Sequence, residues 1–235
     1  MTKLFNEEIK TLYERLVSGK KFAFSKYADG EWAIMNNKPI VAQGEFEFNP
    51  LADYFYSDKL LESYRYRDDG YYIGVSCPCC QGMETHKMMI KVSKQPEDHI
   101  TYANIFVNAN YPFYVDNFVP YYATQKVILV CNRNGKVENL PFKPEKIYHI
   151  DQTAFKTNYG LIEEIKKDVV EVKDHLYLFC AGPLGNMLSH QLWEVNKNNT
   201  YLDIGSTLNP WLQSEGHKRD YYMGKDLSQR NCRWG

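Results

Sequence analysis

The chain has 235 residues, of which 28 are basic and 29 acidic, so its formal net charge is −1. Such a balance gives no broad positive field for a polyanion, which argues against a dedicated nucleic-acid-binding protein but leaves a local basic patch open. The length suits one α/β domain with a buried sheet. We see no secretory signal and no run long enough to cross a membrane. We therefore expect a cytoplasmic protein, located in the host cytoplasm if the source is viral.

The first quarter of the chain predicts a helix, a strand and further helices. Phe5, Ile9, Leu12 and Leu16 recur at helical spacing, and Asn6 is the expected cap of that helix. The next expected elements are a strand over residues 21–27, a short helix over 33–35, and a helix that starts at Asn49-Pro50 and ends near residue 61.

Beyond residue 70 the expected strands alternate with helices, which predicts a Rossmann-like α/β domain with a mostly parallel sheet flanked by helices. Residues 126–131 form the clearest buried strand, because they are a continuous apolar run between turn residues. The other expected strands cover residues 71–76, 104–107, 146–150, 175–181 and 200–204. Helices are expected over residues 83–92, 161–169 and 184–195. Residues 212–235 lack periodicity, and we expect an irregular tail that can act as a lid.

Six cysteines are spread along the chain, at positions 77, 79, 80, 131, 180 and 232. In a cytosolic protein they are expected to be thiols. Cys131 and Cys180 lie in apolar runs and are interpreted as core residues. The cluster Cys77–Cys80, with His86 nearby, is a partial set of zinc ligands, but its spacing is not that of a zinc knuckle. Because the cluster follows an expected strand, the sequence favours a substrate-facing loop over a zinc site.

Two carboxylates, Asp29 and Glu31, follow the first expected strand and are separated by Gly30. Ligands of open parallel sheets bind at the carboxyl ends of the strands. Two hard oxygen ligands suit a divalent cation such as Mn²⁺ or Mg²⁺. Because an Asp-x-Glu is common by chance and Asp-Gly is a strong turn signal, the spacing alone leaves a plain turn open.

The strand, Asp29-Gly30-Glu31-Trp32 and the short helix together resemble the opening of the GT-D-fold glycosyltransferases, bacterial and viral enzymes that use nucleotide sugars. Two later segments are similar to the same family, the strand–Gly-Pro–helix unit over residues 176–188 and the Leu-Asp-Ile-Gly strand over 201–206. The three blocks follow the family's order between about residues 21 and 211. The resemblance implies one GT-D-type domain over residues 1–235 that transfers a hexosyl or pentosyl group with the help of a metal ion. It implies a UDP-sugar as the donor.

The resemblance also implies roles for individual residues. Asp29 and Glu31 are expected to hold Mn²⁺ or Mg²⁺ beside the leaving diphosphate, and Gly30 to lie against the donor. Glu31 and Asp203 are the candidate catalytic residues, since either carboxylate can serve as a base. Many family members continue Leu-Asp-Ile-Gly with a His and an acidic residue. This chain reads Ser-Thr-Leu-Asn over residues 206–209, which leaves the acceptor chemistry open.

Other candidates for binding the nucleotide sugar follow other expected strands or lie in the tail. Glycines in the turn before residue 184 allow a ligand to approach, and free amides at a helix start suit a phosphate. Arg133 can pair with a phosphate, as can Arg219 in the basic run His217-Lys218-Arg219. These additional candidates are Asn108, Asn110, Arg133, Gly182, Gly185, Asn186 and Arg219. The plain alternatives are a tight turn, a solvated arginine and a solvated tail.

The sequence leaves the acceptor open. Bacterial family members suggest a glycan or a glycoprotein. The composition is also typical of a phage or low-GC genome, so a phage enzyme that glycosylates modified (hydroxymethylated) DNA bases is an alternative, with the basic tail and the Cys77–Cys80 loop as DNA contacts. Another alternative is a nucleotide-binding interaction module that has lost catalysis. A phosphate-ester hydrolase is disfavoured, because we see no second set of metal ligands.

Overall fold

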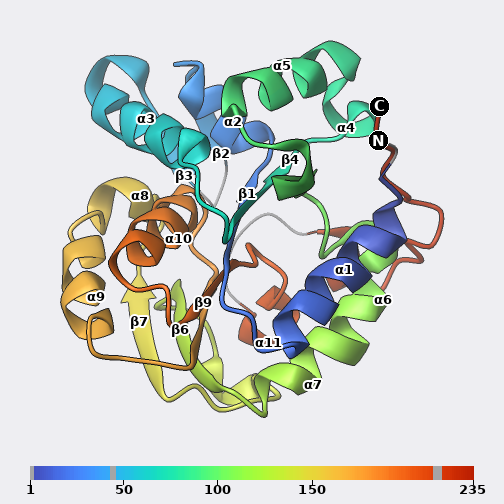
Figure 1. The fold of residues 1–235 in the computed structure, drawn as a ribbon. Coiled ribbons are helices and arrows are strands. Elements are labelled where there is room, and N and C mark those ends of the chain that lie inside the picture. The colour runs from blue at the N-terminus through green and yellow to red at the C-terminus, as the bar shows by residue number, and fades with distance from the viewer. Residues whose placement is uncertain (1–2, 43–45, 214–218) are drawn as a thin grey trace.

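A seven-stranded parallel sheet forms the centre of the protein (Figure 1). The computed structural model describes residues 3–42, 46–213 and 219–235. The strand order is β5-β4-β1-β9-β8-β6-β7, and every neighbouring pair is parallel. The strands are β1 (Ala23–Tyr27), β4 (Tyr71–Val75), β5 (Ile100–Tyr102), β6 (Lys126–Asn132), β7 (Lys146–Ile150), β8 (His175–Phe179) and β9 (Thr200–Asp203). A separate antiparallel pair consists of β2 (Ile40–Ala42) and β3 (Phe46–Phe48).

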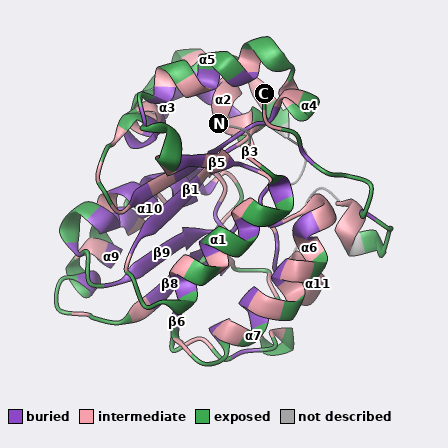
Figure 2. Ribbon diagram, turned by 45° about the vertical axis from the view of Figure 1, so that its right-hand side comes forward, coloured by how far each residue is buried: buried purple, intermediate pink, exposed green. Residues whose placement is uncertain are grey.

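Helices cover both faces of the sheet, and the strands between them are largely buried (Figures 1 and 2). One face packs against α2 (Asp29–Met35), α3 (Pro50–Arg65), α5 (Met83–Ser93), α8 (Ala154–Thr157), α9 (Leu161–Val169) and α10 (Pro183–Val195). The other face packs against α1 (Phe5–Val17), α6 (Tyr111–Phe113), the π-helical segment Tyr114–Phe118, α7 (Val119–Tyr122) and α11 (Asn209–Leu212). Apolar cores therefore lie on both faces, as a parallel sheet requires.

Short elements complete the described part of the chain. Helix α4 (Pro78–Gln81) follows β4, and four 3₁₀ turns cover Glu97–His99, Asn108–Asn110, Val137–Asn139 and Asp220–Met223. Among the described residues, none of the helices combines the length and the apolarity needed to cross a lipid bilayer.

The predicted alternation of strands and helices is confirmed, with three local corrections. Residues 104–107 form a turn and the strand precedes it as β5; Ile105 and Phe106 are apolar because this turn packs into the core. Asn6 lies inside α1 and does not cap it, since Leu4 holds the cap position and Asn6 Nδ2 donates to Glu7 Oε1. The Asp-Gly pair at residues 29 and 30 is no turn either, because it begins α2.

The connections that follow the two central strands, β1 and β9, lead to opposite faces of the sheet. After β1 the chain enters α2, whose Ile34 and Met35 pack in the first core. After β9 it reaches α11, whose Leu212 packs in the second core. Where neighbouring parallel strands diverge in this way, a crevice opens at their carboxyl ends, and ligands of α/β proteins bind there.

Candidate functional site

A cleft of about 1210 Å³ lies at the carboxyl ends of the central strands. Segments that follow β1, β4, β8 and β9 line it, together with parts of the C-terminal tail. The cleft is large enough for a nucleotide-sized ligand. Seven of the eleven residues predicted to be catalytic or to bind the nucleotide sugar line it: Asp29, Gly30, Glu31, Asn108, Gly182, Asp203 and Arg219.

Glu31 faces the cleft from the first turn of α2. Its Oε2 accepts a hydrogen bond from the backbone N–H of Ala28 at 2.9 Å, which fixes the side chain against the helix start. Burial raises the pKa of Glu31 to about 7, and the nearby Asp203 carboxylate also raises it, whereas Lys26 lowers it. Near neutral pH the side chain therefore exists in both protonation states.

Asp203 lies at the floor of the cleft, where it is almost fully buried. Its Oδ2 accepts from the Lys26 backbone N–H at 3.0 Å and from Asn186 Nδ2 at 3.4 Å. Its Oδ1 accepts from the Gly205 N–H at 3.1 Å. Burial raises the pKa of Asp203, while Lys26 opposes this shift. With both oxygens engaged, Asp203 ties β1 to the loop after β9.

Lys26 belongs to the site although the sequence indicated only a strand residue. It lines the cleft, and its charge lowers the pKa of both Glu31 and Asp203. A Cβ added to Gly205 would lie 2.6 Å from Lys26 Nζ, so the ammonium group rests on the loop after β9. A lysine near the carboxyl end of a strand buried on both faces was the available signal, because burying such a charge is costly.

Asp29 occupies the exposed rim of the cleft. Next to it, Gly30 leaves room for an aromatic ring: a Cβ added there would lie 2.7 Å from Phe46 Cζ. The same ring lies near Gly182, where an added Cβ would be 3.9 Å from Phe46 Cδ1. Phe46 also packs edge-on against Phe155 at 6.0 Å between ring centroids. This ring, which the sequence analysis missed, lies between the start of α2 at Gly30 and the turn at Gly182.

The turn that leads into α10 contributes less to the cleft than the sequence suggests. Gly182 has a φ of +52° and lines the cleft beside Pro183, which has no N–H to donate. Gly185 and Asn186 are buried outside the cleft lining. A Cβ on Gly185 would lie 3.2 Å from Phe179 Cβ, so this glycine lets α10 pack closely on the sheet. These two residues, predicted to bind the nucleotide, therefore do not line the cleft.

Asn186 instead acts beneath the cleft. Its Nδ2 donates to Ser25 Oγ at 2.9 Å and to the Lys26 carbonyl at 2.5 Å, in addition to its contact with Asp203. It therefore connects α10 to β1 and β9 and holds the backbone that carries Lys26.

Of three other residues predicted to bind the nucleotide sugar, one lines the cleft and two do not. Asn108 lines the cleft with a φ of +56°, a conformation that asparagine tolerates. Asn110 is buried outside the lining, and its Nδ2 donates to the carbonyls of Phe5 and Ile105, both at 2.9 Å. Arg133 lies outside the lining, and its Nε pairs at 2.5 Å with Oδ1 of Asp151, which does line the cleft. Of these three, Asn108 lines the cleft.

The C-terminal tail borders the cleft, as does the loop after β4. Arg219 and Tyr221 line it, whereas His217 and Lys218 lie outside the described residues. The Tyr221 ring lies 4.5 Å from Tyr111, and its Oη is 2.7 Å from Ser206 Oγ. The expectation that the Cys77–Cys80 loop lies at the same sheet edge as Asp29 is confirmed, since Cys79 and Cys80 line the cleft.

Comparisons with known proteins identify the fold. No protein-family model matches the chain, and no curated protein matches it. A solved structure described as a domain of unknown function 1792 with a distinct glycosyltransferase fold is 12% identical, with a TM-score of 0.63 over 93% of this chain and 88% of that one. A glycosyltransferase of the same domain type from Streptococcus sanguinis is 16% identical, with a TM-score of 0.59 over 93% and 91% of the two chains. At these identities the likeness concerns the fold, so the chain has an α/β glycosyltransferase fold.

Proposed function

We propose that this protein is a glycosyltransferase that moves a sugar from a nucleotide-sugar donor, a UDP-sugar, to a glycan or glycoprotein acceptor. The observation that carries the proposal is the group of Lys26, Glu31 and Asp203 at the carboxyl ends of β1 and β9, with Asp29 on the rim of the same cleft. This is the position in which an α/β sheet binds its ligand. The glycosyltransferase fold supports the proposal.

The carboxylates of the cleft fit a hard divalent cation. Asp29 is exposed, and none of the described hydrogen bonds or ion pairs engages its carboxylate, so it is available as an oxygen ligand for Mn²⁺ or Mg²⁺. Glu31 would be the second ligand when it is ionised. Such a cation offsets negative charge on the departing diphosphate.

The remaining cleft residues would position the donor. Lys26 supplies a positive charge at the floor, and Arg219 supplies one from the tail. Phe46 offers a ring face for a base or a sugar between Gly30 and Gly182. Asp203 and Asn186 hold Lys26 in place through its backbone.

The transfer forms a bond between the acceptor oxygen and the anomeric carbon and breaks the bond from that carbon to the diphosphate. The acceptor hydroxyl must lose its proton in this step. Glu31, with a pKa of about 7, is suited to accept it, so two roles compete for this side chain: metal ligand and base. Glu31→Gln separates them, because a ligand role predicts weaker metal-dependent nucleotide binding, whereas a base role predicts unchanged binding and slower transfer.

Isothermal titration with UDP, with and without Mn²⁺, tests the site. We expect Asp29→Asn to weaken Mn²⁺-dependent UDP binding by at least about tenfold, or about 1.4 kcal/mol. Glu164→Gln on the exposed side of α9 is the matched control and should bind like the wild type. If UDP, GDP and dTDP all fail to bind, or if Asp29→Asn leaves binding unchanged, the proposed donor site is wrong.

A transfer assay tests the reaction itself. A panel of labelled nucleotide sugars is offered with glycans, glycoproteins and hydroxymethylated DNA as acceptors. Transfer to a glycan or glycoprotein supports the proposal in full, and transfer to DNA supports the phage-type alternative instead. Nucleotide binding without transfer to any acceptor identifies an interaction module.

A further inference from the structure

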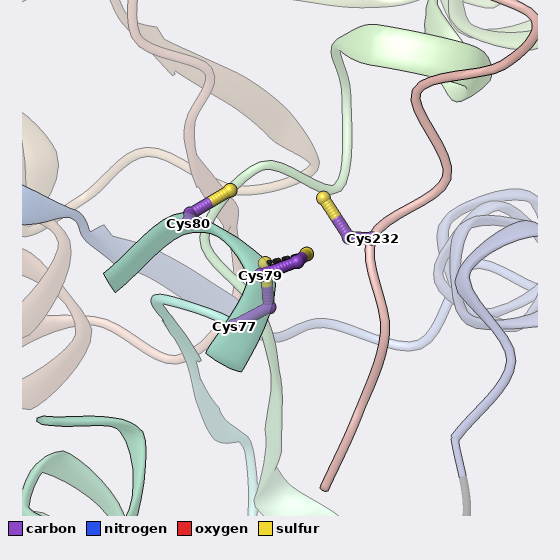
Figure 3. A group of neighbouring side chains, drawn as sticks. All are labelled: Cys77, Cys79, Cys80 and Cys232. Carbon is purple, nitrogen blue, oxygen red and sulfur yellow. Dashed lines mark hydrogen bonds between the residues drawn. The ribbon is translucent and has the colours of Figure 1, made fainter. Parts of the chain in front are cut away.

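Four cysteines from two distant parts of the chain converge (Figure 3). They lie at one edge of the cleft, which Cys79, Cys80 and Cys232 line. Cys77, Cys79 and Cys80 come from the start of α4, and Cys232 comes from the C-terminal tail. Their four Sγ atoms all lie within 4.8 Å of one another. Cys77 and Cys232 are buried, whereas Cys79 and Cys80 are exposed.

The spacing of the sulfurs matches a single metal ion better than a pair of disulfides. A tetrahedral zinc ion with Zn–S bonds of about 2.3 Å places its sulfurs about 3.8 Å apart, within the observed limit. The Sγ atoms of Cys77 and Cys79 are 3.0 Å apart, well beyond the bond of about 2.05 Å in a disulfide. Zinc binding requires these two sulfurs to move apart by about 0.8 Å. An iron–sulfur cluster of several atoms has no room between four sulfurs that lie within 4.8 Å of one another.

Three N–H donors point at the sulfurs. Asn104 Nδ2 donates to Cys80 Sγ at 3.3 Å, Asn108 Nδ2 donates to Cys232 Sγ at 3.6 Å, and the backbone N–H of Arg233 donates to Cys79 Sγ at 3.4 Å. Such donors stabilise thiolates, which are the form of cysteine that binds metal. His86 is not part of this group of ligand atoms, and its Nδ1 lies 2.8 Å from the Ser76 carbonyl.

We propose that Cys77, Cys79, Cys80 and Cys232 bind one structural Zn²⁺ that fastens the C-terminal tail to the edge of the cleft. Four thiolates form a soft, closed ligand set, which selects zinc over Mn²⁺ or Mg²⁺. This site is therefore separate from the carboxylates of the proposed function and does not depend on it.

The contacts beside the cluster show what the ion would secure. Trp234 packs edge-on against His86, with ring centroids 4.7 Å apart, and against Tyr102 at 5.0 Å. The carbonyl of Arg230 accepts from the Ala109 N–H at 3.3 Å. The tail segment before Cys232 lines the cleft through Arg219, Asp220, Tyr221, Leu227, Arg230 and Asn231. A metal bond at Cys232 would fix the position of this tail segment along the cleft.

Metal analysis of the untagged protein, produced in zinc-supplemented medium, tests the proposal directly. We expect inductively coupled plasma mass spectrometry to find about one zinc ion per chain. Replacement by Co²⁺ should give the visible absorption of a tetrahedral cobalt–thiolate site. Cys232→Ser and Cys80→Ser should lose at least about tenfold in zinc affinity, whereas Cys131→Ala, in strand β6 away from the cluster, should retain one zinc.

Limited trypsin digestion provides a readout that is independent of activity. Removal of zinc by a chelator should speed cleavage after the exposed Lys225 in the tail, and added zinc should restore protection. A purified wild type without metal, a disulfide within the cluster under reducing preparation, or full zinc retention in Cys232→Ser would overturn the proposal. Iron in place of zinc would overturn the assignment of the ion.

Discussion

One buried residue, His190, makes the stability of the fold depend on pH. It is 3% exposed on α10, its Nδ1 lies 3.1 Å from Ser63 Oγ, and its ring lies 4.2 Å from that of Tyr66. Burial lowers the pKa of His190 to about 4. The charged side chains around it are Lys59, Glu62, Lys166 and Glu194.

We predict that acid destabilises the protein through His190. Between pH 6.5 and pH 4 the unfolded state binds a proton at this side chain and the folded state does not, so the stability falls as the pH falls through this window. From pH 7 to pH 5 the loss is about 2 kcal/mol. Denaturant unfolding of wild type and His190→Gln at both pH values checks this, since the variant should lose less stability.

The exposed His149 supplies the control for this experiment. His149→Gln should keep the pH dependence of the wild type. If His190→Gln also keeps it in full, then His190 is not the residue that takes up the proton.

Several residues of the site could be predicted from the sequence, because they follow strands in sequence as well as in space. Asp29 and Glu31 come directly after β1, and Asp203 ends β9. Lys26 and Cys232 could not be assigned in the same way. The role of Lys26 depends on how its long side chain bends over Gly205, and that of Cys232 depends on a contact between the tail and α4. Both roles depend on tertiary contacts, and for Lys26 the sequence offered one local signal, a charged residue near the end of an apolar strand.

At the scale of elements, β4 and β5 meet unusually closely. A Cβ added to Gly74 would lie 2.7 Å from the Tyr102 carbonyl oxygen and 2.9 Å from Ala103 Cα, both backbone atoms that cannot rotate away. The turn that follows β5 carries Asn104 and Asn108 to the cleft. Glycine at this position therefore sets the spacing of the sheet edge and the place of that turn.

We predict that Gly74→Ala destabilises the protein by at least about 2 kcal/mol, because β5 must shift to admit the methyl group. Gly160→Ala is the matched control. Gly160 has a φ of −61° and nothing within 4 Å of an added Cβ, so its effect should stay within about 1 kcal/mol. Thermal unfolding of both variants measures the difference. Equal stabilities for the two variants would show that β5 can move away from β4 at little cost in free energy, which would contradict the prediction.

Comparing two predicted strands shows when a local sequence pattern is enough to predict an element. The run at residues 126–131 predicted β6 correctly, because a long apolar stretch between turn residues has few other structures available. The run at 104–107 misled, because Ile105 and Phe106 are as buried as strand residues while their backbone turns. Apolarity indicates burial, and it indicates the backbone conformation as well when the run is long and bounded by turn residues, as at residues 126–131. The strand order across the sheet had no signal in the sequence.

At the scale of the whole molecule, the sheet and the tail make separable contributions. All seven strands of the main sheet and both apolar cores lie largely before residue 214, while the tail borders the cleft. We predict that a chain ending at Gln213 still folds but binds UDP at least about tenfold more weakly, because one wall of the cleft is gone. Circular dichroism and titration with UDP measure the two effects.

A chain ending at Asn199 is the informative comparison, because it lacks β9. It should fail to form a cooperative structure, since β1 and β8 would then have no strand between them. A shorter chain that unfolds as cooperatively as the longer one would contradict this view of the sheet.

The position of β9 also has a consequence for biosynthesis. It pairs with β1 on one side and β8 on the other, through Ala23–Tyr201 and Leu178–Leu202 among other partners. The middle of the sheet is therefore the last part of it to leave the ribosome. At about 5 to 20 residues per second, the nascent chain carries β1 for about 9 to 35 s before its central neighbour β9 is translated. During that time the open edges of β1 and β8 can pair with other chains, so a lower expression level with chaperones present should raise the yield of folded protein.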